Sequence, residues 1–255
     1  MNKESNFLIE AQNISKYFGN VKALENVNLK IGENKIIGLL GDNGSGKSTF
    51  IKILTGVYAP TKGKLLWKGK EIKRLTVQMA RNLGIATVFQ DKGLAPQQSI
   101  WRNIFIGKEL INKLGFIRIK EQKKETVRLM TELMKFTSTS TTSPYTLVGM
   151  LSGGEQKGVA ISRALYFEAS LIILDEPTTE LSLSEVKKVL DFVRKIKAEG
   201  KSCIFISHNL FHVYPVAERI VILDRGKIVE DIKKEDLTLE KLEERMYEIA
   251  AVSSK

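Results

Sequence analysis

The sequence has no apolar run that approaches the ~20 residues required by a membrane-spanning helix. Its first six residues, Met-Asn-Lys-Glu-Ser-Asn, lack the apolar core of a secretory signal peptide. The chain has a single cysteine, Cys203, which excludes an internal disulfide and fits a reducing compartment. We therefore expect a protein without a membrane span of its own.

Histidine is also scarce, because His208 and His212 are the only two in the chain. Their i, i+4 spacing can hold zinc on a helix, but Asn209 stands where the H-E-x-x-H pattern has its glutamate. No third ligand follows at a recognisable spacing. Neither a nucleophile elbow nor a Cys-x-x-Cys pair occurs. A zinc site is therefore not expected.

The composition is otherwise ordinary for a globular protein, with 43% hydrophobic and 27% charged residues among 255. A chain of this length can bury a sizeable core in one domain with a subdomain or two. The formal net charge of +11 suggests an anionic partner: a nucleotide, a nucleic acid or an anionic membrane surface. A surface that is simply rich in lysine explains the same charge, so the charge alone does not show whether there is an anionic partner or which one it is.

The most informative stretch is Gly41-Asp-Asn-Gly-Ser-Gly-Lys-Ser-Thr49, which fits the phosphate-loop pattern G-x-x-x-x-G-K-[ST]. A buried strand is predicted before it at 35–40, and a helix after it at 48–55. The glycines let the backbone wrap a phosphate, and the helix N-terminus adds partial positive charge. Lys47 can reach the terminal phosphates and the Ser48 hydroxyl can ligate Mg²⁺. We therefore expect a nucleotide site here.

The segments around this loop alternate in the way that is typical of an α/β fold. Strands and turns are predicted over 7–31, and a small hairpin over 64–72. A helix is predicted at 77–83, and a buried strand at 85–89 ends at Gln90. Later in the chain we expect a strand at 219–223, a turn at 224–227 and an amphipathic helix at 238–249 that can pack back on the domain.

The middle of the chain, about 91–154, is predicted to be a helical insertion. The helical pattern continues from 99 to 135, and 137–143 is a short polar loop of Ser and Thr. Trp101 and Phe105 lie beside a predicted loop. Core packing of a helix explains them, and a groove for a partner is the alternative.

Two S-x-x-E patterns predict capped helices. The second, Ser182 with Glu185, starts a helix that ends at Gly200. The first, Ser152 with Glu155, lies in the run Leu-Ser-Gly-Gly-Glu. A well-capped helix explains that run by itself, but a Ser-Gly-Gly start also offers bare N–H groups to a phosphate. The pattern alone leaves both interpretations open.

Two carboxylates follow a continuous apolar strand at 171–174. Open α/β sheets bind ligands at this end of their strands. Asp175 can hold Mg²⁺ through water, and Glu176 can orient and polarise an attacking water as a general base. A further buried strand, 202–207, is followed directly by His208.

The phosphate loop, Gln90, the run Leu-Ser-Gly-Gly-Glu-Gln, the strand ending in Asp-Glu-Pro and His208 together resemble the ATP-binding subunit of ABC transporters. The resemblance covers about 7–232, and the Leu-Ser-Gly-Gly-Glu-Gln run is its most specific part. It implies an α/β fold with a RecA-like phosphate-loop core, an N-terminal antiparallel β subdomain and a helical subdomain. The implied divisions of the single domain are a core at 1–90 and 155–235, a helical subdomain at 91–154 and a tail at 236–255.

The resemblance also implies roles for individual residues. Phe18 matches the aromatic residue that stacks on adenine, with Tyr17 as the alternative. Gln90 matches the lid-loop glutamine, Glu176 the catalytic carboxylate and His208 the switch histidine. The other implied nucleotide-binding residues are Gly41, Asp42, Asn43, Gly44, Ser45, Gly46, Lys47, Ser48 and Thr49. The implied Mg²⁺ ligands are Ser48, Gln90 and, through water, Asp175.

Ser152, Gly153, Gly154 and Glu155 match the family signature, which binds the γ-phosphate of ATP held by the other subunit. The chain has one phosphate loop, one signature and no internal repeat, so it should need a second ATP-binding subunit, identical or similar. The resemblance further implies ATP and Mg²⁺ as cofactors, permease subunits as partners and a peripheral position on the cytoplasmic side of the cell membrane. No nucleic acid is expected as a partner.

Ser182 departs from the commonest family pattern, which has Asp there; it keeps the helix cap but removes a charge at the expected dimer interface. Ser182, the run Leu54-Thr-Gly-Val-Tyr58 and the run Ile206-Ser-His-Asn209 make the chain most similar to subunits of bacterial importers of ribose, xylose and fructose. Many of those fuse two copies in one chain. The resemblance implies sugar import with a sugar-binding protein as an indirect partner. The rival interpretations are a soluble ABC-type ATPase acting on nucleic acid or ribosomes, and an exporter subunit.

Overall fold

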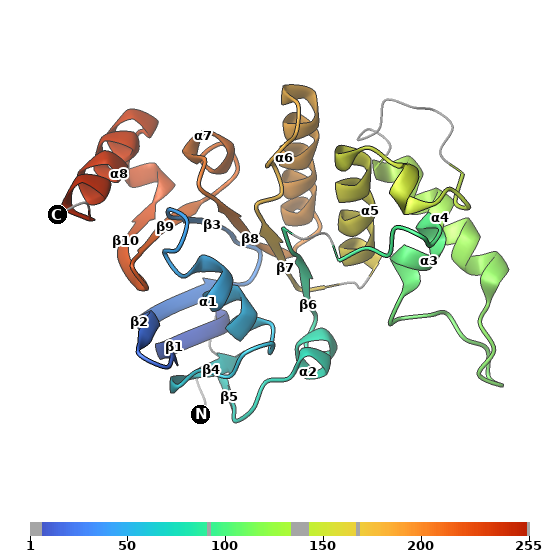
Figure 1. Cartoon of the computed structure of the whole chain (residues 1–255), viewed down its shortest axis with the longest axis horizontal. Helices are drawn as coiled ribbons and strands as arrows, with labels where there is room; N and C mark the ends of the chain where they lie inside the picture. The colour runs from blue at the N-terminus through green and yellow to red at the C-terminus, as the bar shows by residue number, and fades with distance from the viewer. Residues whose placement is uncertain (1–6, 91–92, 134–142, 167–168, 254–255) are drawn as a thin grey trace.

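The computed structural model describes residues 7–90, 93–133, 143–166 and 169–253. Within them the chain builds two β-sheets and a separate group of helices (Figure 1). The smaller sheet is antiparallel and has the strand order β2-β1-β4-β5. Its strands are β1 (Phe7–Phe18), β2 (Val21–Gly32), β4 (Lys62–Trp67) and β5 (Lys70–Ile72).

The larger sheet, as far as the described residues show it, has the strand order β10-β9-β3-β8-β7-β6. All of these strands run parallel except β10, which pairs antiparallel with β9. The central strands are continuous apolar runs because helices or the other sheet cover both of their faces. The bounds are β3 (Ile36–Leu40), β6 (Ile85–Val88), β7 (Leu171–Asp175), β8 (Ser202–Ser207), β9 (Arg219–Asp224) and β10 (Lys227–Lys233).

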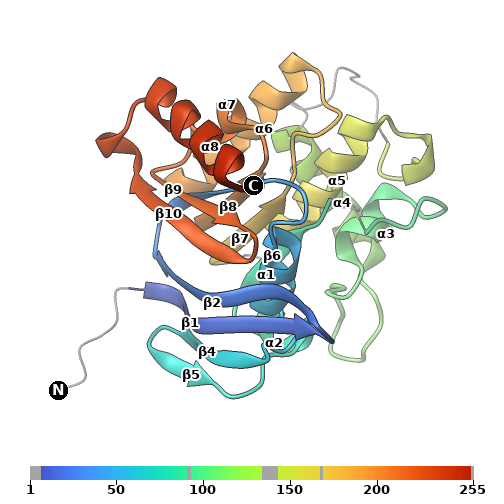
Figure 2. The ribbon, with the colours of Figure 1, turned by 60° about the vertical axis from the view of Figure 1, so that its left-hand side comes forward.

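Alternate residues of the central strands point to opposite faces of the larger sheet. Ile37 and Leu39 pack with α1 (Lys47–Leu54) and the antiparallel sheet, whereas Ile36 and Leu40 pack with helices on the other face. Helix α1 therefore lies between the two sheets (Figure 2). The other face is covered by α5 (Gly153–Tyr166), α6 (Leu183–Ala198), α7 (Leu210–Val213) and α8 (Leu239–Ser253).

The C-terminal helix α8 packs back on the core, in the place where an amphipathic helix was predicted. Leu242 is buried in the cluster that covers the larger sheet, and Met246 and Ile249 pack against that cluster. The Tyr214 hydroxyl donates a hydrogen bond to the Leu237 carbonyl oxygen at 3.0 Å, which fixes the start of the helix against α7.

The helices α3 (Ile100–Phe105) and α4 (Ile119–Leu133) form a third apolar cluster with α5, at the right of Figure 1. The ring of Phe105 is buried, 4.4 Å from the ring of Tyr166, so core packing explains this aromatic residue. Trp101 is only half-buried. The shorter helices are α2 (Val77–Asn82), η2 (Val148–Met150) and η3 (Lys234–Asp236).

The prediction of helical structure throughout 99–135 was wrong in its middle. Residues 106–118 separate α3 from α4 and contain a short antiparallel bridge. Gly107 and Gly115 have φ values of 81° and 84°, which a right-handed helix does not contain. Apolar residues at helical spacing therefore belong to a hairpin here. The predicted polar loop lies outside the described residues up to position 142.

A buried asparagine joins α3 to the segment that follows Gln90. Asn103 is 1% exposed, and its Oδ1 accepts a hydrogen bond from the Ala95 N–H at 2.7 Å. Its Nδ2 group lies 3.0, 3.2 and 3.1 Å from the carbonyl oxygens of Ala95, Gln98 and Ser99. Each of these three carbonyl oxygens also accepts a backbone N–H, whereas the Ala95 N–H bonds to the Asn103 side chain.

We predict that Asn103→Ala lowers the free energy of unfolding by about 1–3 kcal/mol, because it removes the hydrogen bonds of a buried side chain and takes away the partner of the Ala95 N–H. Urea titration followed by circular dichroism measures this change. The control is Asn82→Ala at the exposed end of α2, where the side chain accepts one hydrogen bond from Gln78. That control should change stability by less than about 0.5 kcal/mol. Equal effects of the two substitutions would contradict the structural role of Asn103.

Candidate functional site

Four segments meet at the carboxyl end of the larger sheet. β3, β8, β7 and β6 are parallel neighbours, so the residues that follow them leave the sheet at one edge. The phosphate loop follows β3, His208 follows β8, Glu176 follows β7 and Gln90 follows β6. Strand order therefore brings together groups that are far apart in the sequence.

The phosphate loop is held closely by its surroundings. A Cβ on Gly41 would lie 2.2 Å from the Leu223 carbonyl oxygen, and Gly46, which precedes α1, has a φ of 107°. The Gly226 N–H donates to the Ser45 carbonyl oxygen at 2.8 Å. The Ser45 hydroxyl is buried and has no hydrogen-bond partner among the described residues. With the free N–H groups of the first turn of α1, the loop offers the donors that a phosphate accepts.

Lys47 begins α1 and turns its ammonium group back over the loop. It is 7% exposed, and its Nζ donates to the carbonyl oxygens of Gly41 at 2.6 Å and Asp42 at 2.8 Å. Burial lowers the pKa of Lys47, and the carboxylates of Glu176, Asp175 and Asp42 oppose that change. The other predicted loop residues are exposed or half-buried: Asn43, Gly44, Ser48 and Thr49.

Glu176 is held from two sides. It is 6% exposed, and its backbone φ of 48° is uncommon for a residue other than glycine. Its Oε1 accepts from the His208 N–H at 3.0 Å and lies 2.9 Å from Nδ1 of that histidine. Its Oε2 accepts from the hydroxyls of Ser207 at 3.1 Å and Thr179 at 3.2 Å. The orientation of the carboxylate is therefore fixed by the protein itself.

Three residues that support Glu176 are not identified by the sequence: two bond to its carboxylate and one to the backbone. Two are Ser207 and Thr179, whose hydroxyls bond to the carboxylate. Their places in the sequence, close to His208 and Glu176, could have indicated this role. The third is Lys157, a buried residue of α5. Its Nζ donates to the carbonyl oxygens of Thr179 and, at 3.4 Å, Glu176. No local pattern identifies Lys157, because the contact depends on how α5 packs.

Gln90 is exposed two residues after the end of β6. It lines a cavity of about 470 Å³ together with Gln156, Lys157 and Thr179. The structure therefore places Gln90 near the residues that support Glu176, as the order of the strands requires.

The run that matches the family signature begins α5, and its capping box is present. The Ser152 N–H donates to the Glu155 carboxylate at 2.8 Å, and the Glu155 N–H donates to the Ser152 hydroxyl at 3.3 Å. A Cβ on Gly154 would lie 2.0 Å from Oε1 of Glu185, so a larger residue there would displace the Glu185 side chain. Ser152 and Gly153 are exposed. Figure 1 shows α5 standing apart from α1, so the structure does not bring this turn to the phosphate loop of the same chain.

Phe18, the predicted adenine-stacking residue, is exposed at the end of β1. Its ring lies edge-on to that of Tyr58, with 5.4 Å between the ring centroids, and the Lys16 ammonium is 5.1 Å from its centroid. Tyr17 is half-buried, and its N–H donates to the Thr61 hydroxyl. Phe18 is therefore the more accessible of the two rings.

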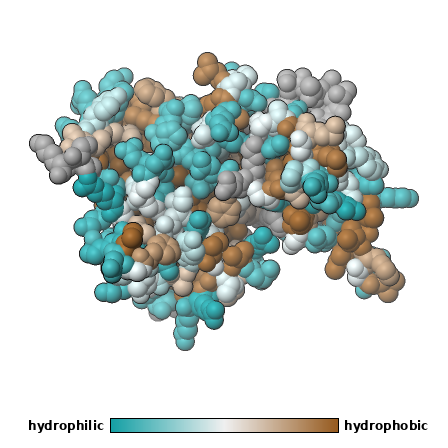
Figure 3. Space-filling view, viewed as in Figure 1, coloured by the Kyte–Doolittle hydropathy of each residue, from teal (hydrophilic) through white to brown (hydrophobic). Residues whose placement is uncertain are grey.

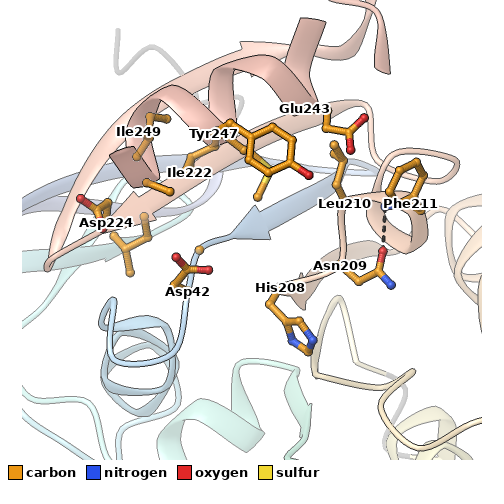
Figure 4. Close-up of a pocket in the computed structure, with 14 residues that line it drawn as sticks. Asp42, His208, Asn209, Leu210, Phe211, Ile222, Asp224, Glu243, Tyr247 and Ile249 are labelled. Atoms are coloured by element: carbon orange, nitrogen blue, oxygen red, sulfur yellow. Dashed lines mark hydrogen bonds between the residues drawn. The ribbon is translucent and has the colours of Figure 1, made fainter. Parts of the chain in front are cut away.

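A cavity of about 380 Å³ opens beside Asp42 and His208 (Figure 4). Residues of α8, among them Tyr247 and Ile249, line it from the other side. The C-terminal helix thus borders the edge where the phosphate loop and His208 lie.

The two histidines have different partners. His208 precedes α7 and contacts Glu176, whereas His212 lies within α7 and its Nδ1 is 3.0 Å from the Thr178 hydroxyl. Burial lowers the pKa of His212 and nearby His208 adds to this, while Glu176 acts in the opposite direction.

Comparison with known proteins identifies the family. Residues 24–179 match the family model described as ABC transporter. The xylose/arabinose import ATP-binding protein XylG of Sulfolobus acidocaldarius is 41% identical over 243 residues, which are 95% of each protein. The chain belongs to the ABC transporter family. The predicted resemblance to this family is therefore confirmed.

Other relatives of this ABC transporter chain are longer. The ribose import ATP-binding protein RbsA of Caldanaerobacter subterraneus subsp. tengcongensis is 34% identical over 94% of the chain. The alignment covers 47% of that relative, so the chain spans about half the length of RbsA. Within the described residues, none of the helices is both long and apolar enough to cross a membrane.

Solved ABC transporter structures have the same fold. A dimeric ATP-binding cassette in a post-hydrolysis state with ADP and Pi matches with a TM-score of 0.76 and 26% identity, over 89% of this chain and 98% of that one. A nucleotide-free cassette matches with a TM-score of 0.75 and 25% identity, over 89% and 91%. The predicted cassette fold and the prediction of an ABC transporter ATPase are confirmed.

We predict that His212 lowers the stability of the folded chain as the pH falls. Because its pKa is lowered by folding from a usual value of 6.5, the unfolded chain binds the proton first, and stability declines from about pH 6.5 down to the folded pKa. His212→Gln should therefore reduce the difference in unfolding free energy between about pH 7.5 and about pH 5.5. Urea titrations of both proteins at the two pH values measure this. An unchanged difference in the variant would contradict the prediction.

Proposed function

We propose that this chain is the ATP-hydrolysing, energy-coupling subunit of a transporter that imports a monosaccharide. The proposal rests on the fixed carboxylate of Glu176 beside the buried Lys47, in a chain closely similar to a xylose/arabinose import ATP-binding protein. On this proposal the chain is bound peripherally to permease subunits at the cytoplasmic face of the membrane.

ATP binds with its phosphates in the loop from Gly41 to Thr49 and its adenine on the ring of Phe18. The donors of that loop, including the unpaired Ser45 hydroxyl, suit a triphosphate. Mg²⁺, when bound, neutralises charge on the β- and γ-phosphates. The residues that would hold it are Ser48, Gln90 and, through water, Asp175.

Hydrolysis depends on positioning and electrostatics. Glu176 orients and polarises the attacking water, because its carboxylate is held by hydrogen bonds at both oxygens. Lys47 stabilises the negative charge that develops on the γ-phosphate, and His208 contacts the same group. His208 also bonds to Glu176, so the two groups act as one unit.

Each ATP is shared by two subunits on this proposal. The signature residues Ser152, Gly153, Gly154 and Glu155 bind the γ-phosphate of ATP held by a second copy of the chain. The exposure of Ser152 and Gly153 and the separation of this turn from the phosphate loop of the same chain support this arrangement. The dimeric state of a similar solved cassette supports it as well.

Coupling to the permease is proposed at a groove of about 410 Å³ between α2 and the end of α3. Apolar side chains of Val57, Phe89 and Ile106 line it, with the guanidinium groups of Arg81 and Arg163. Burial lowers the pKa of Arg163, and the charge of Arg81 adds to this. Two neighbouring cations, of which Arg81 is exposed, suit the carbonyl oxygens at the C-terminal end of a permease helix.

We predict that Glu176→Gln traps an ATP-bound dimer. The substitution removes the general base while leaving the phosphate loop intact, so hydrolysis falls by about 10²-fold or more and nucleotide binding persists. Size-exclusion chromatography in Mg·ATP measures the dimer, and a phosphate-release assay measures turnover.

The matched control is Lys47→Ala combined with Glu176→Gln. It removes the ammonium group over the loop, so the variant should bind ATP weakly and elute as a monomer. If Glu176→Gln alone remains a monomer in Mg·ATP, the shared-site mechanism is wrong.

Co-purification tests the transport role. We expect the tagged chain, extracted gently from its native membrane, to bring down a multi-span permease together with a sugar-binding protein. Identification of the ligand of that binding protein then identifies the imported sugar. Recovery of ribosomal proteins or nucleic acid instead would contradict sugar import while leaving the ATPase assignment in place.

A further inference from the structure

The segment between α3 and α4 is a hairpin that projects from the group of helices, at the lower right of Figure 1. The Arg118 N–H donates to the Leu110 carbonyl oxygen at 2.7 Å, and the Asn112 N–H donates to that of Phe116 at 2.9 Å. The Asn112 side chain closes the turn by accepting from the N–H groups of Leu114 and Phe116, each at 2.9 Å. The tip therefore has a fixed shape.

That fixed shape displays apolar side chains to the solvent. Leu114 is 81% exposed and Phe116 is 69% exposed. The other exposed apolar residues of the hairpin are Ile106, Ile111 and Ile117, and Ile119 is exposed at the start of α4. Figure 3 shows brown, hydrophobic residues projecting at the corner where Figure 1 places this segment. A structured hairpin that exposes such a patch indicates an interaction surface.

Basic residues precede and follow the apolar tip in the sequence. Residues 107–124 comprise the hairpin and the start of α4, and contain six lysine or arginine residues and two glutamates, a net charge of +4 out of +11 for the whole chain. The hairpin up to residue 118 has three of these basic residues and one glutamate, a net charge of +2. One glutamate, Glu121, pairs with Arg118. The other, Glu109, accepts from the Gly107 N–H at 3.2 Å. The positive charge of the hairpin is thus complementary to an anionic surface.

Aromatic rings lie next to this basic segment. The Lys123 ammonium is 4.3 Å from the ring centroid of Tyr145 and 5.5 Å from that of Trp101. Tyr145 is exposed. Lysines and amphipathic rings beside apolar side chains are typical of segments at the level of lipid headgroups.

We propose that this hairpin is a membrane-surface anchor, in which Leu114 and Phe116 enter the headgroup region of an anionic bilayer. The neighbouring lysines contact the lipid phosphates. A lipid surface fits better than a protein pocket because the apolar residues stand on a projecting tip, in a segment with a net positive charge. The hairpin also begins at Gly107, which lines the groove assigned to the permease. The assignment of that groove to the permease, and so the direction in which the hairpin faces the membrane, rests on the proposed function.

The test is co-sedimentation of the purified full chain with vesicles that contain no permease. We expect binding to phosphatidylcholine vesicles with about a third phosphatidylglycerol, weak binding to phosphatidylcholine alone, and a loss of binding in high salt. Leu114→Ser with Phe116→Ser should lower the affinity for the anionic vesicles about tenfold. The matched control, Val21→Ser with Leu183→Ser, removes two apolar residues exposed elsewhere and should leave the affinity unchanged.

A second variant tests the charge with the apolar tip intact: Lys113→Glu with Lys120→Glu should also weaken binding. Wild-type binding to anionic vesicles that is no stronger than to neutral ones would overturn the proposal. So would full binding by the Leu114/Phe116 variant. If the wild type does not bind vesicles and the Leu114/Phe116 variant no longer co-purifies with the permease, the hairpin contacts a protein instead. Since the vesicles hold no permease, failure of the anchor leaves the proposed function standing.

Discussion

The parallel pairing of β8 between β3 and β7 is the constraint on which the site depends. Leu40 pairs with Ser207 and Asp175 with Ile206, so the loops that follow these strands begin at nearly the same level. Glu176 and His208 can therefore bond although they are 32 residues apart in the chain. Apolar side chains on both faces keep this register, because a slip of one residue would exchange the two faces.

Much of this architecture was predictable because its signals are local. The glycines of the phosphate loop, the two S-x-x-E caps and the apolar runs each report on a few neighbouring residues. The contacts of Lys157 and Ser207 with Glu176 were not predictable, since they depend on which strands and helices become neighbours. The hairpin at 106–118 was not predicted because its apolar residues are spaced as in a helix. The positive φ values of its glycines, which exclude a helix, are seen only in the structure.

Helix α5 belongs to two apolar clusters. Val159 packs with α3 and α4, whereas Ala160, Ile161 and Ala164 pack against the larger sheet. Lys157, on the same helix, donates to the backbone beside Glu176. The signature turn is therefore carried by a helix that both parts of the molecule hold, and its position responds to the packing of either part.

The four hydrogen bonds of Asn103 have a mechanical consequence. They tie the backbone at residues 95, 98 and 99 to α3, so this segment and the helix form one hydrogen-bonded piece. The piece starts a few residues after Gln90 and ends beside Ile106 in the apolar groove. We expect a displacement of this segment to move α3 with it, because one side chain bonds to both, and α3 then needs no contact of its own with nucleotide.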